Sequence, residues 1–152
     1  MSSDTMPSIE TRAQAPTEEL FKYLTAQGNR SYGAGRLTQL GYALQVAHLA
    51  REAGAYDNTI VAALLHDIRQ FIPVYEYMPV MIAPNGSQVG RRGHAVFGEI
   101  YLRELGFNDK TFRLVGAHEM AKRYLTVVDK DYYDKLTKIS KNSLRLQVGA
   151  PP

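Results

Sequence analysis

The sequence predicts an all-α fold, and three observations carry this prediction. Apolar residues recur at spacings of three and four along most of the chain, which is the period of an amphipathic helix. No segment shows the convincing two-residue alternation that half-buried strands show. One predicted helix, from Asp57 to Ile68, is apolar almost all round, so we expect it in the middle of a helical bundle.

Two further helices are predicted before this central one. Residues 1–16 are polar and contain Ser, Thr and Pro, so we expect a disordered leader, with the folded domain spanning residues 17–149. Thr17 is a suitable N-cap for the first helix, and Gly28 is a suitable end for it. The second helix covers residues 37–53, where leucines and alanines step by three and four.

The segment from Phe71 to Gly90 interrupts the helical pattern. Three prolines and an Asn-Gly pair rule out a long helix there. Its many apolar side chains argue against simple disorder, so we expect a Pro/Gly-rich lid over the functional site. Helical periodicity returns from Arg91 to Leu105, from Asn108 to about Leu125 and from about Tyr132 to Leu146.

Composition excludes several classes of function. The chain has no cysteine, which excludes disulfides, thiolate catalysis and Cys-ligated metal centres. A net charge of +3 without a basic stripe argues against nucleic acid as a partner and suits a small anion. No stretch approaches the roughly 20 apolar residues of a membrane span, and the N-terminus lacks a signal-peptide core, so we expect a cytoplasmic protein. The sequence is silent on oligomeric state.

Histidines in apolar helical settings are the strongest functional signal. His66 and Asp67 end the run Val-Ala-Ala-Leu-Leu, where burial of either side chain costs roughly several kcal/mol unless it is paired or binds a cation. His94 begins an amphipathic pattern, and His118 shares a helical face with Val115. We therefore predict a metal site built from several helices, with nitrogen and oxygen ligands that suit iron, manganese, magnesium or zinc.

Each of these residues also has a purely structural interpretation. His66 alone is equally typical of a hydrogen-bonded core histidine, and His94 of a solvent-facing helix start. Lys122, one turn after His118, has the spacing of a surface lysine whose stem is covered. If Lys122 instead points inward with His118, its ammonium and a metal together favour an anionic ligand. We interpret His48 as structural or exposed.

The order of these motifs resembles the HD-domain superfamily. His-Asp is followed by Gly-His-x-x-x-Gly-x-x-Tyr-Leu and then by His-x-x-x-Lys-Arg-Tyr-Leu. More narrowly, the chain is similar to the mixed-valence di-iron oxygenases of that superfamily, which oxidatively cleave the carbon–phosphorus bond of hydroxylated aminoethylphosphonates. The similarity runs from about Tyr32 to Gly149, and its most specific segment is 121–125.

The resemblance implies an HD-domain bundle in which six side chains hold two irons, and a reaction of O2 with a small anionic substrate. It carries four metal ligands over to this chain, namely His66, Asp67 as the bridge, His94 and His118. It implies that Tyr32 is a lid residue over the open iron position. It also implies that the phosphonate group is surrounded by Lys122, Ser140, Ser143 and Gln147. No catalytic residue beyond the metal ligands is implied.

The chain departs from the family pattern around the first iron. Tyr42 stands where the family has its first His ligand. His48 cannot replace that ligand, because it lies about 240° round the helix and about 9 Å along it. Arg69 and Gln70 stand in place of a Gly-His pair. No acidic residue follows Asp134, although the family's last Asp ligand comes near the C-terminus.

These departures leave the number of metal ions and the reaction open. Asp67, His94 and His118 alone make the two-His-one-carboxylate set of non-haem Fe(II) enzymes. A second iron requires another ligand, such as Tyr42 as a phenolate. We expect an iron oxygenase acting on a phosphonate-like anion. The alternatives are a phosphohydrolase using another divalent metal, a catalytically inactive binding protein, and a truncated chain whose last helix is missing.

Overall fold

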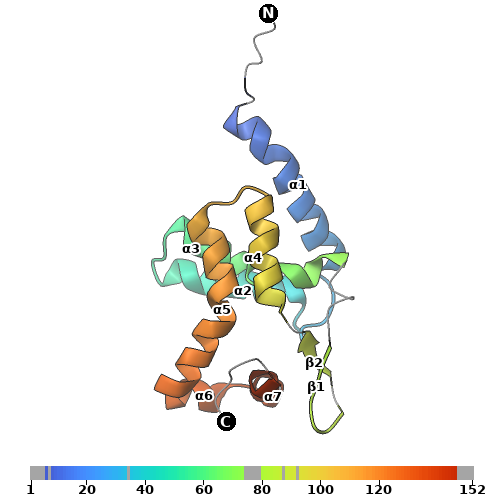
Figure 1. Ribbon diagram of the computed structural model, residues 1–152, viewed down its shortest axis with the longest axis vertical. Coiled ribbons are helices and arrows are strands. Elements are labelled where there is room, and N and C mark those ends of the chain that lie inside the picture. The colour runs from blue at the N-terminus through green and yellow to red at the C-terminus, as the bar shows by residue number, and fades with distance from the viewer. Residues whose placement is uncertain are drawn as a thin grey trace, which may run out of the picture.

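The computed structural model describes residues 6, 8–33, 35–73, 80–86, 88–91 and 93–146. Within these ranges the fold is the predicted all-α bundle, with one small antiparallel hairpin added (Figure 1). The elements are α1 (Ile9–Gln27), α2 (Gln39–Glu52), α3 (Asp57–Leu65), the 3-10 helix η1 (Ile68–Phe71), β1 (Val80–Ile82), β2 (Gln88–Arg91), α4 (His94–Glu104), α5 (Asp109–Val128), α6 (Lys130–Lys135) and α7 (Lys138–Leu146). Helix α3 contacts both α2 and α5, so it is central as predicted.

Helix α1 begins well before the predicted start at Thr17. Ser8 is its N-cap, and the Ser8 hydroxyl accepts a hydrogen bond from a backbone N–H of the first turn. The prediction of a disordered leader is therefore wrong for residues 9–16, where Glu, Arg, Ala and Gln favour a helix. Pro16 lies inside the helix without ending it, and Thr17 donates its hydroxyl proton to the Ala13 carbonyl instead of capping.

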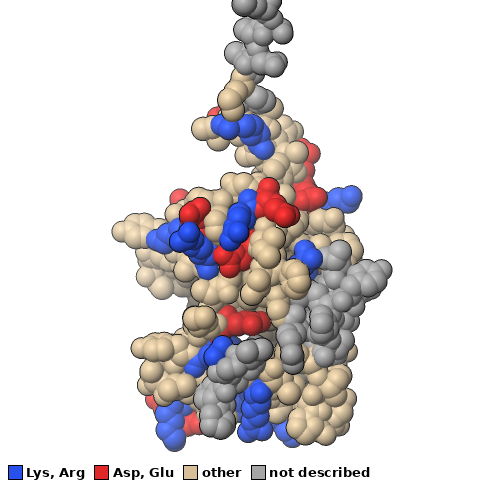
Figure 2. Space-filling model, in the orientation of Figure 1, with Lys and Arg blue, Asp and Glu red and all other residues tan. Residues whose placement is uncertain are grey.

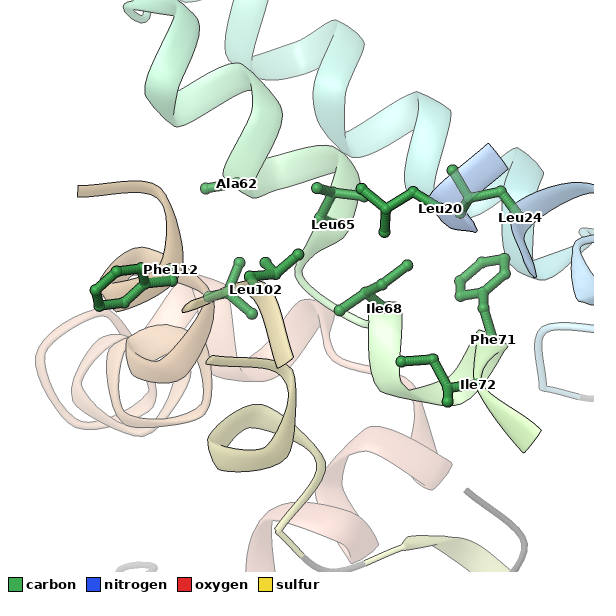
Figure 3. Packing of buried hydrophobic residues seen from close by; sticks show 10 residues of the cluster. Leu20, Leu24, Ala62, Leu65, Ile68, Phe71, Ile72, Leu102 and Phe112 are labelled. Carbon is green, nitrogen blue, oxygen red and sulfur yellow. The ribbon is translucent and has the colours of Figure 1, made fainter. Parts of the chain in front are cut away.

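The main core lies where α1, α3 and η1 meet α4 and α5. Its buried members are Leu20, Leu24, Ala62, Leu65, Ile68, Phe71, Ile72, Leu102, Phe112 and Val115. Figure 3 shows Leu65 and Ile68 between Leu20 of α1 and Leu102 of α4. Each side chain of this size contributes roughly 1.5–3 kcal/mol when fully buried. The core therefore fixes α3, α4 and α5, the three helices that lead to the candidate site.

Gly98 lets α4 and α5 approach each other closely. A Cβ atom at Gly98 would lie 3.1 Å from Cγ1 of Val115, which is fully buried on α5. Gly98 lies about one helical turn after His94, and Val115 lies about one turn before His118. The close approach at this glycine therefore brings the two histidines from different helices to one place.

The central helix ends at Leu65, before the His-Asp pair. His66 is its C-cap, and Asp67 has φ −105° and ψ 24°, outside the helical range, before η1 begins. The pair thus stands at a break between two helical elements, instead of within one continuous helix that ends at Ile68 as predicted. At this break, Nε2 of His66 and Oδ2 of Asp67 lie 3.2 Å apart.

The described part of the expected lid forms the β1–β2 hairpin. The turn places Pro84 and Asn85 at its centre, and Gly86 at φ 81° donates its N–H to the Ala83 carbonyl. The expectation of a segment without strands is wrong here because Pro-Asn-Gly closes a tight turn between two short extended runs. Met81 and Ala83 are buried, and β2 packs against α7. Residues 74–79 lie outside the described ranges, and the role of a lid stays a prediction.

The C-terminal helices differ from the prediction in their boundaries. His94 is the first residue of α4, because residues 88–91 are in a strand and Gly93 has a left-handed backbone with φ 79°. Asn108 caps α5 as predicted. The predicted last helix is two helices, α6 and α7, because Leu136 is extended. Across the described ranges, no helix has both the length and the apolarity that crossing a membrane requires.

Candidate metal centre

The Asp67 carboxylate is the centre of the candidate site. Its side chain is only 11% exposed. Oδ1 lies 3.2 Å from Nε2 of His94 and 3.5 Å from Nε2 of His118. Oδ2 lies 3.2 Å from Nε2 of His66. The structure thus brings together all four residues that the sequence singled out, with the two carboxylate oxygens facing different histidines.

The distances on the Oδ1 side fit a single metal ion. The His94 and His118 Nε2 atoms lie 3.2 Å apart, so with Asp67 Oδ1 they form a triangle with edges of 3.2, 3.2 and 3.5 Å. Two ligand atoms that are each about 2.1 Å from one ion, at an angle of about 100°, lie about 3.2 Å apart. Within the described part of the chain, these three side chains are the one such group of His, Asp and Glu.

All three histidines have their Nδ1 atom engaged, which directs Nε2 toward Asp67. Nδ1 of His66 and of His118 each lie 2.7 Å from the backbone carbonyl three residues earlier, which can only accept a proton. Nδ1 of His94 lies 2.9 Å from a Glu119 carboxylate oxygen. A neutral histidine that donates from Nδ1 carries its lone pair on Nε2. Once the Nε2 proton of His94 is displaced, three lone pairs and a carboxylate converge, which is the donor set that a cation requires.

Electrostatics within the site also favour a cation. Burial by itself would raise the pKa of Asp67, but His66 and His94 hold that pKa well below its usual value. Burial lowers the pKa of His94, yet hydrogen bonds to Asp67 and Glu119 outweigh it and raise the pKa to about 10. The pKa of His118 is lowered, chiefly by burial. A bound metal would take the place of the proton on His94, so metal binding would release protons.

Two tyrosines occupy the side of the site beyond His66. The Tyr42 ring meets the His66 ring edge-on, with centroids 5.6 Å apart. Tyr32 stacks on Tyr42 with centroids 3.9 Å apart and an interplanar angle of 13°. Burial raises the pKa of the Tyr32 hydroxyl, and the neighbouring Tyr42 raises it further. The structure thus places both tyrosines beside the site, while coordination by Tyr42 and a lid role for Tyr32 stay predictions.

The predicted anion-binding residues differ in how closely they approach the site. Lys122 is partly buried on α5, where burial lowers its pKa while the Asp67 and Glu119 carboxylates raise it. Its ammonium is thus within electrostatic reach of the site. Ser140 and Ser143 are partly buried on α7, which packs against β2, so their contact with a substrate stays a prediction. Gln147 lies outside the described residues.

Comparison with known proteins agrees with this geometry. The HD domain family matches residues 43–143 of the 152 in the chain, a range that includes every residue of the metal triangle. The chain belongs to the HD-domain family. The His-Asp pair of this HD domain stands at the break between α3 and η1, and its other two histidines come from α4 and α5.

The HD domain has relatives among phosphonate-oxidising enzymes. Hydroxymethylphosphonate dioxygenase of Gimesia maris is 35% identical over 130 residues, which cover 86% of this chain and 61% of the relative. The glycine-betaine-forming 1-hydroxy-2-(trimethylamino)ethylphosphonate dioxygenase of Leisingera caerulea is 30% identical over 123 residues, covering 81% and 59%. An uncharacterized protein of Acanthamoeba polyphaga mimivirus is 32% identical over 120 residues, covering 79% and 52%. The chain thus spans 52–61% of these relatives' lengths.

Sequence reasoning missed one residue that contacts the site of this HD domain. Glu119 is 23% exposed and pairs with His94 across the α4–α5 contact. The signal was present, because Glu119 directly follows His118 just as Asp67 directly follows His66. In both dipeptides, a carboxylate directly follows a histidine of the candidate site. His48, in contrast, is exposed on α2, in keeping with its interpretation from the sequence.

Proposed function

We propose that this HD domain is a non-haem iron oxygenase that acts on a small, hydroxylated, phosphonate-like anion. The observation that carries the proposal is the triangle of Asp67 Oδ1, His94 Nε2 and His118 Nε2. Two nitrogens and one carboxylate oxygen on one face of an ion are the donor set of non-haem Fe(II) oxygenases. The names of two relatives, both phosphonate dioxygenases, support the oxidative reaction and the substrate class.

Iron in this donor set supplies the redox chemistry that O2 requires and keeps coordination positions open for the substrate. The chain's own residues hold the ligands in place and neutralise charge. Asp67 offsets part of the ion's charge from a nearly buried position. The engaged Nδ1 atoms keep the histidine rings from rotating away from the ion.

Basic side chains near the site support an anionic substrate. Lys122 is partly buried, and the charges of the Asp67 and Glu119 carboxylates act to raise its pKa against the larger effect of burial. Helices α6 and α7 carry five Lys or Arg residues against two Asp residues, and Figure 2 shows blue side chains at the end of the molecule that these helices form. We propose that this positive end attracts the anion and that Lys122 pairs with its phosphonate oxygens, with Ser140, Ser143 and Gln147 as further donors.

We propose that oxidation cleaves the carbon–phosphorus bond of this substrate and that one iron per chain is the minimum requirement. Oδ2 of Asp67 faces His66 while Oδ1 faces His94 and His118, which supports a bridging role of the carboxylate. A second ion on that side would need Tyr42 or water to complete its ligands. The ring of Tyr42 lies against the ring of His66, which supports a role for Tyr42 in binding a second ion on the Oδ2 side.

The first test combines metal content with an assay that varies O2. Protein purified anaerobically from iron-supplemented cells should hold about one iron per chain, or about two if Tyr42 acts as a ligand. Hydroxymethylphosphonate should then release phosphate only when O2 is present. Phosphate release from simple phosphoesters without O2 would instead establish a phosphohydrolase. Tight anion binding without turnover, together with little metal, would establish a binding protein.

A matched pair of variants tests the anion site. Lys122→Met should raise KM for the phosphonate about tenfold, because one charge-assisted contact to the anion contributes on the order of 1–3 kcal/mol. Lys22→Met, on the exposed surface of α1, removes the same charge outside this positive end and should leave KM unchanged within about twofold. Equal effects of the two substitutions would contradict a specific role for Lys122.

A further inference from the structure

His94 differs from the other two histidines in its place within its helix. His66 and His118 each use the backbone carbonyl of the residue three positions earlier to hold Nδ1, at 2.7 Å. Such a carbonyl exists because a full helical turn precedes each of them. His94 is the first residue of α4, and Arg91, three positions before it, belongs to strand β2. Within the described residues, no turn of α4 therefore precedes His94.

Glu119, on the neighbouring helix α5, contacts Nδ1 of His94. Its carboxylate oxygen Oε1 lies 2.9 Å from Nδ1 of His94, and both side chains are largely buried, at 23% and 14% exposure. It can reach across because α5 packs closely against α4, and because it directly follows His118 on α5. The interaction is thus a tertiary contact between α4 and α5, whereas the Nδ1 contacts of His66 and His118 are local. A charged acceptor also makes a stronger hydrogen bond than a backbone carbonyl.

We propose that Glu119 is the positioning residue for His94. Its carboxylate accepts a hydrogen bond from Nδ1–H, which keeps Nε2 pointed at Asp67 Oδ1 and His118 Nε2 and thereby sets the metal affinity of the triangle. The inference rests on the proposed metal at this site, but not on the reaction that the metal catalyses. Outer hydrogen-bond partners of ligand histidines typically contribute about 10–100-fold to metal affinity.

The test uses Co(II) as the probe, measured by chelator competition and by its visible absorption, so that it is independent of oxygenase activity. Glu119→Ala should weaken Co(II) binding about 10–100-fold, and Glu119→Gln, which keeps a neutral acceptor, should be intermediate. Glu99→Gln is the matched control, because Glu99 has a similar exposure of 26% but pairs with Arg103 on its own helix. This control should bind Co(II) within about twofold of the unaltered chain.

A second readout separates positioning from mere stabilisation of the fold. Nitrogen-15 NMR of the metal-free protein reports which ring nitrogen of each histidine carries the proton. Glu119→Ala should change the His94 signals and leave those of His66 and His118 as they were, because these two keep their backbone carbonyls. Unchanged Co(II) affinity in Glu119→Ala, or a loss no larger than in Glu99→Gln, would overturn the proposal. Tight Co(II) binding that depends on Glu119 without any phosphonate oxidation would sustain it and refute only the oxygenase function.

Discussion

The two oxygens of Asp67 face environments of opposite character. On the Oδ1 side, α4 and α5 provide two imidazole nitrogens at 3.2 and 3.5 Å, and Glu119 supports one of them from behind. On the Oδ2 side, His66 provides one nitrogen at 3.2 Å, and the ring of Tyr42 meets the His66 ring edge-on. Among the described residues, one carboxylate thus stands between two histidine nitrogens on one side and one on the other. We therefore expect the Oδ1 side to bind metal more tightly than the Oδ2 side.

Removal of the shared carboxylate should have the largest effect, because it breaks both sides at once. Asp67→Asn keeps the shape of the side chain but loses its charge, and we expect metal affinity to fall by about 100-fold or more. Elemental analysis of anaerobically purified protein measures the loss, with circular dichroism to check that the helices persist. His48→Asn is the control, because His48 is exposed on α2. A metal content equal to that of the unaltered chain would contradict the proposed site.

Removal of one histidine from each side compares the sides directly. His118→Ala takes one of the three ligands on the Oδ1 side, and we expect Co(II) affinity to fall more than tenfold. His66→Ala takes away only a neighbour of Oδ2, and we expect a change of about threefold or less for the first ion bound. The two dissociation constants are obtained by chelator competition. Equal losses of affinity would show that both sides contribute equally to metal binding, which would contradict the expected preference for the Oδ1 side.

Substitution of Tyr42 probes what the Oδ2 side lacks. Tyr42→His introduces a nitrogen ligand beside His66, and we expect the iron content to rise from about one toward about two ions per chain. Tyr42→Phe keeps the stacked ring under Tyr32 and should leave the iron content unchanged. If Tyr42→Phe instead lowers the iron content, the Tyr42 hydroxyl is itself a ligand, and the Oδ2 side is more complete than its nitrogen count suggests.

A rise in pH gives the most indirect effect, on the stability of the metal-free protein. The pKa of His94 is about 10 in the folded state and about 6.5 when the chain is unfolded. The stabilisation is therefore full below pH 6.5 and is lost as the pH rises toward 10. Between pH 7 and pH 9, the free energy of unfolding should fall by about 2.5 kcal/mol. Urea denaturation with a chelator present measures this change, and His94→Gln should flatten it. An equally steep fall in His94→Gln would assign the effect to another group.

The helical elements were largely predictable because their signals are local. The Asn108 cap and the central apolar helix needed only neighbours in sequence, and both are found in the structure. The start of α1 is not predicted from the sequence, because residues 9–16 are mostly polar and lack the apolar face that indicates a helix, although Ser8 caps one there. The hairpin was missed because its strands are too short for a two-residue alternation to stand out. Strands as short as these can be identified only when the strand that each pairs with is known.

By itself, the sequence determined the fold class and the four residues that carry the candidate chemistry, since helical periodicity and polar residues in apolar runs are readable along the chain. Only the tertiary structure decided how those residues share the Asp67 carboxylate and that Glu119 holds His94. These arrangements depend on the close packing of α4 on α5 at Gly98 and on the backbone break at Asp67. The first is a distance between two helices, and the second is a pair of backbone angles at one residue. Neither changes the periodicity of the sequence, so neither can be predicted from it.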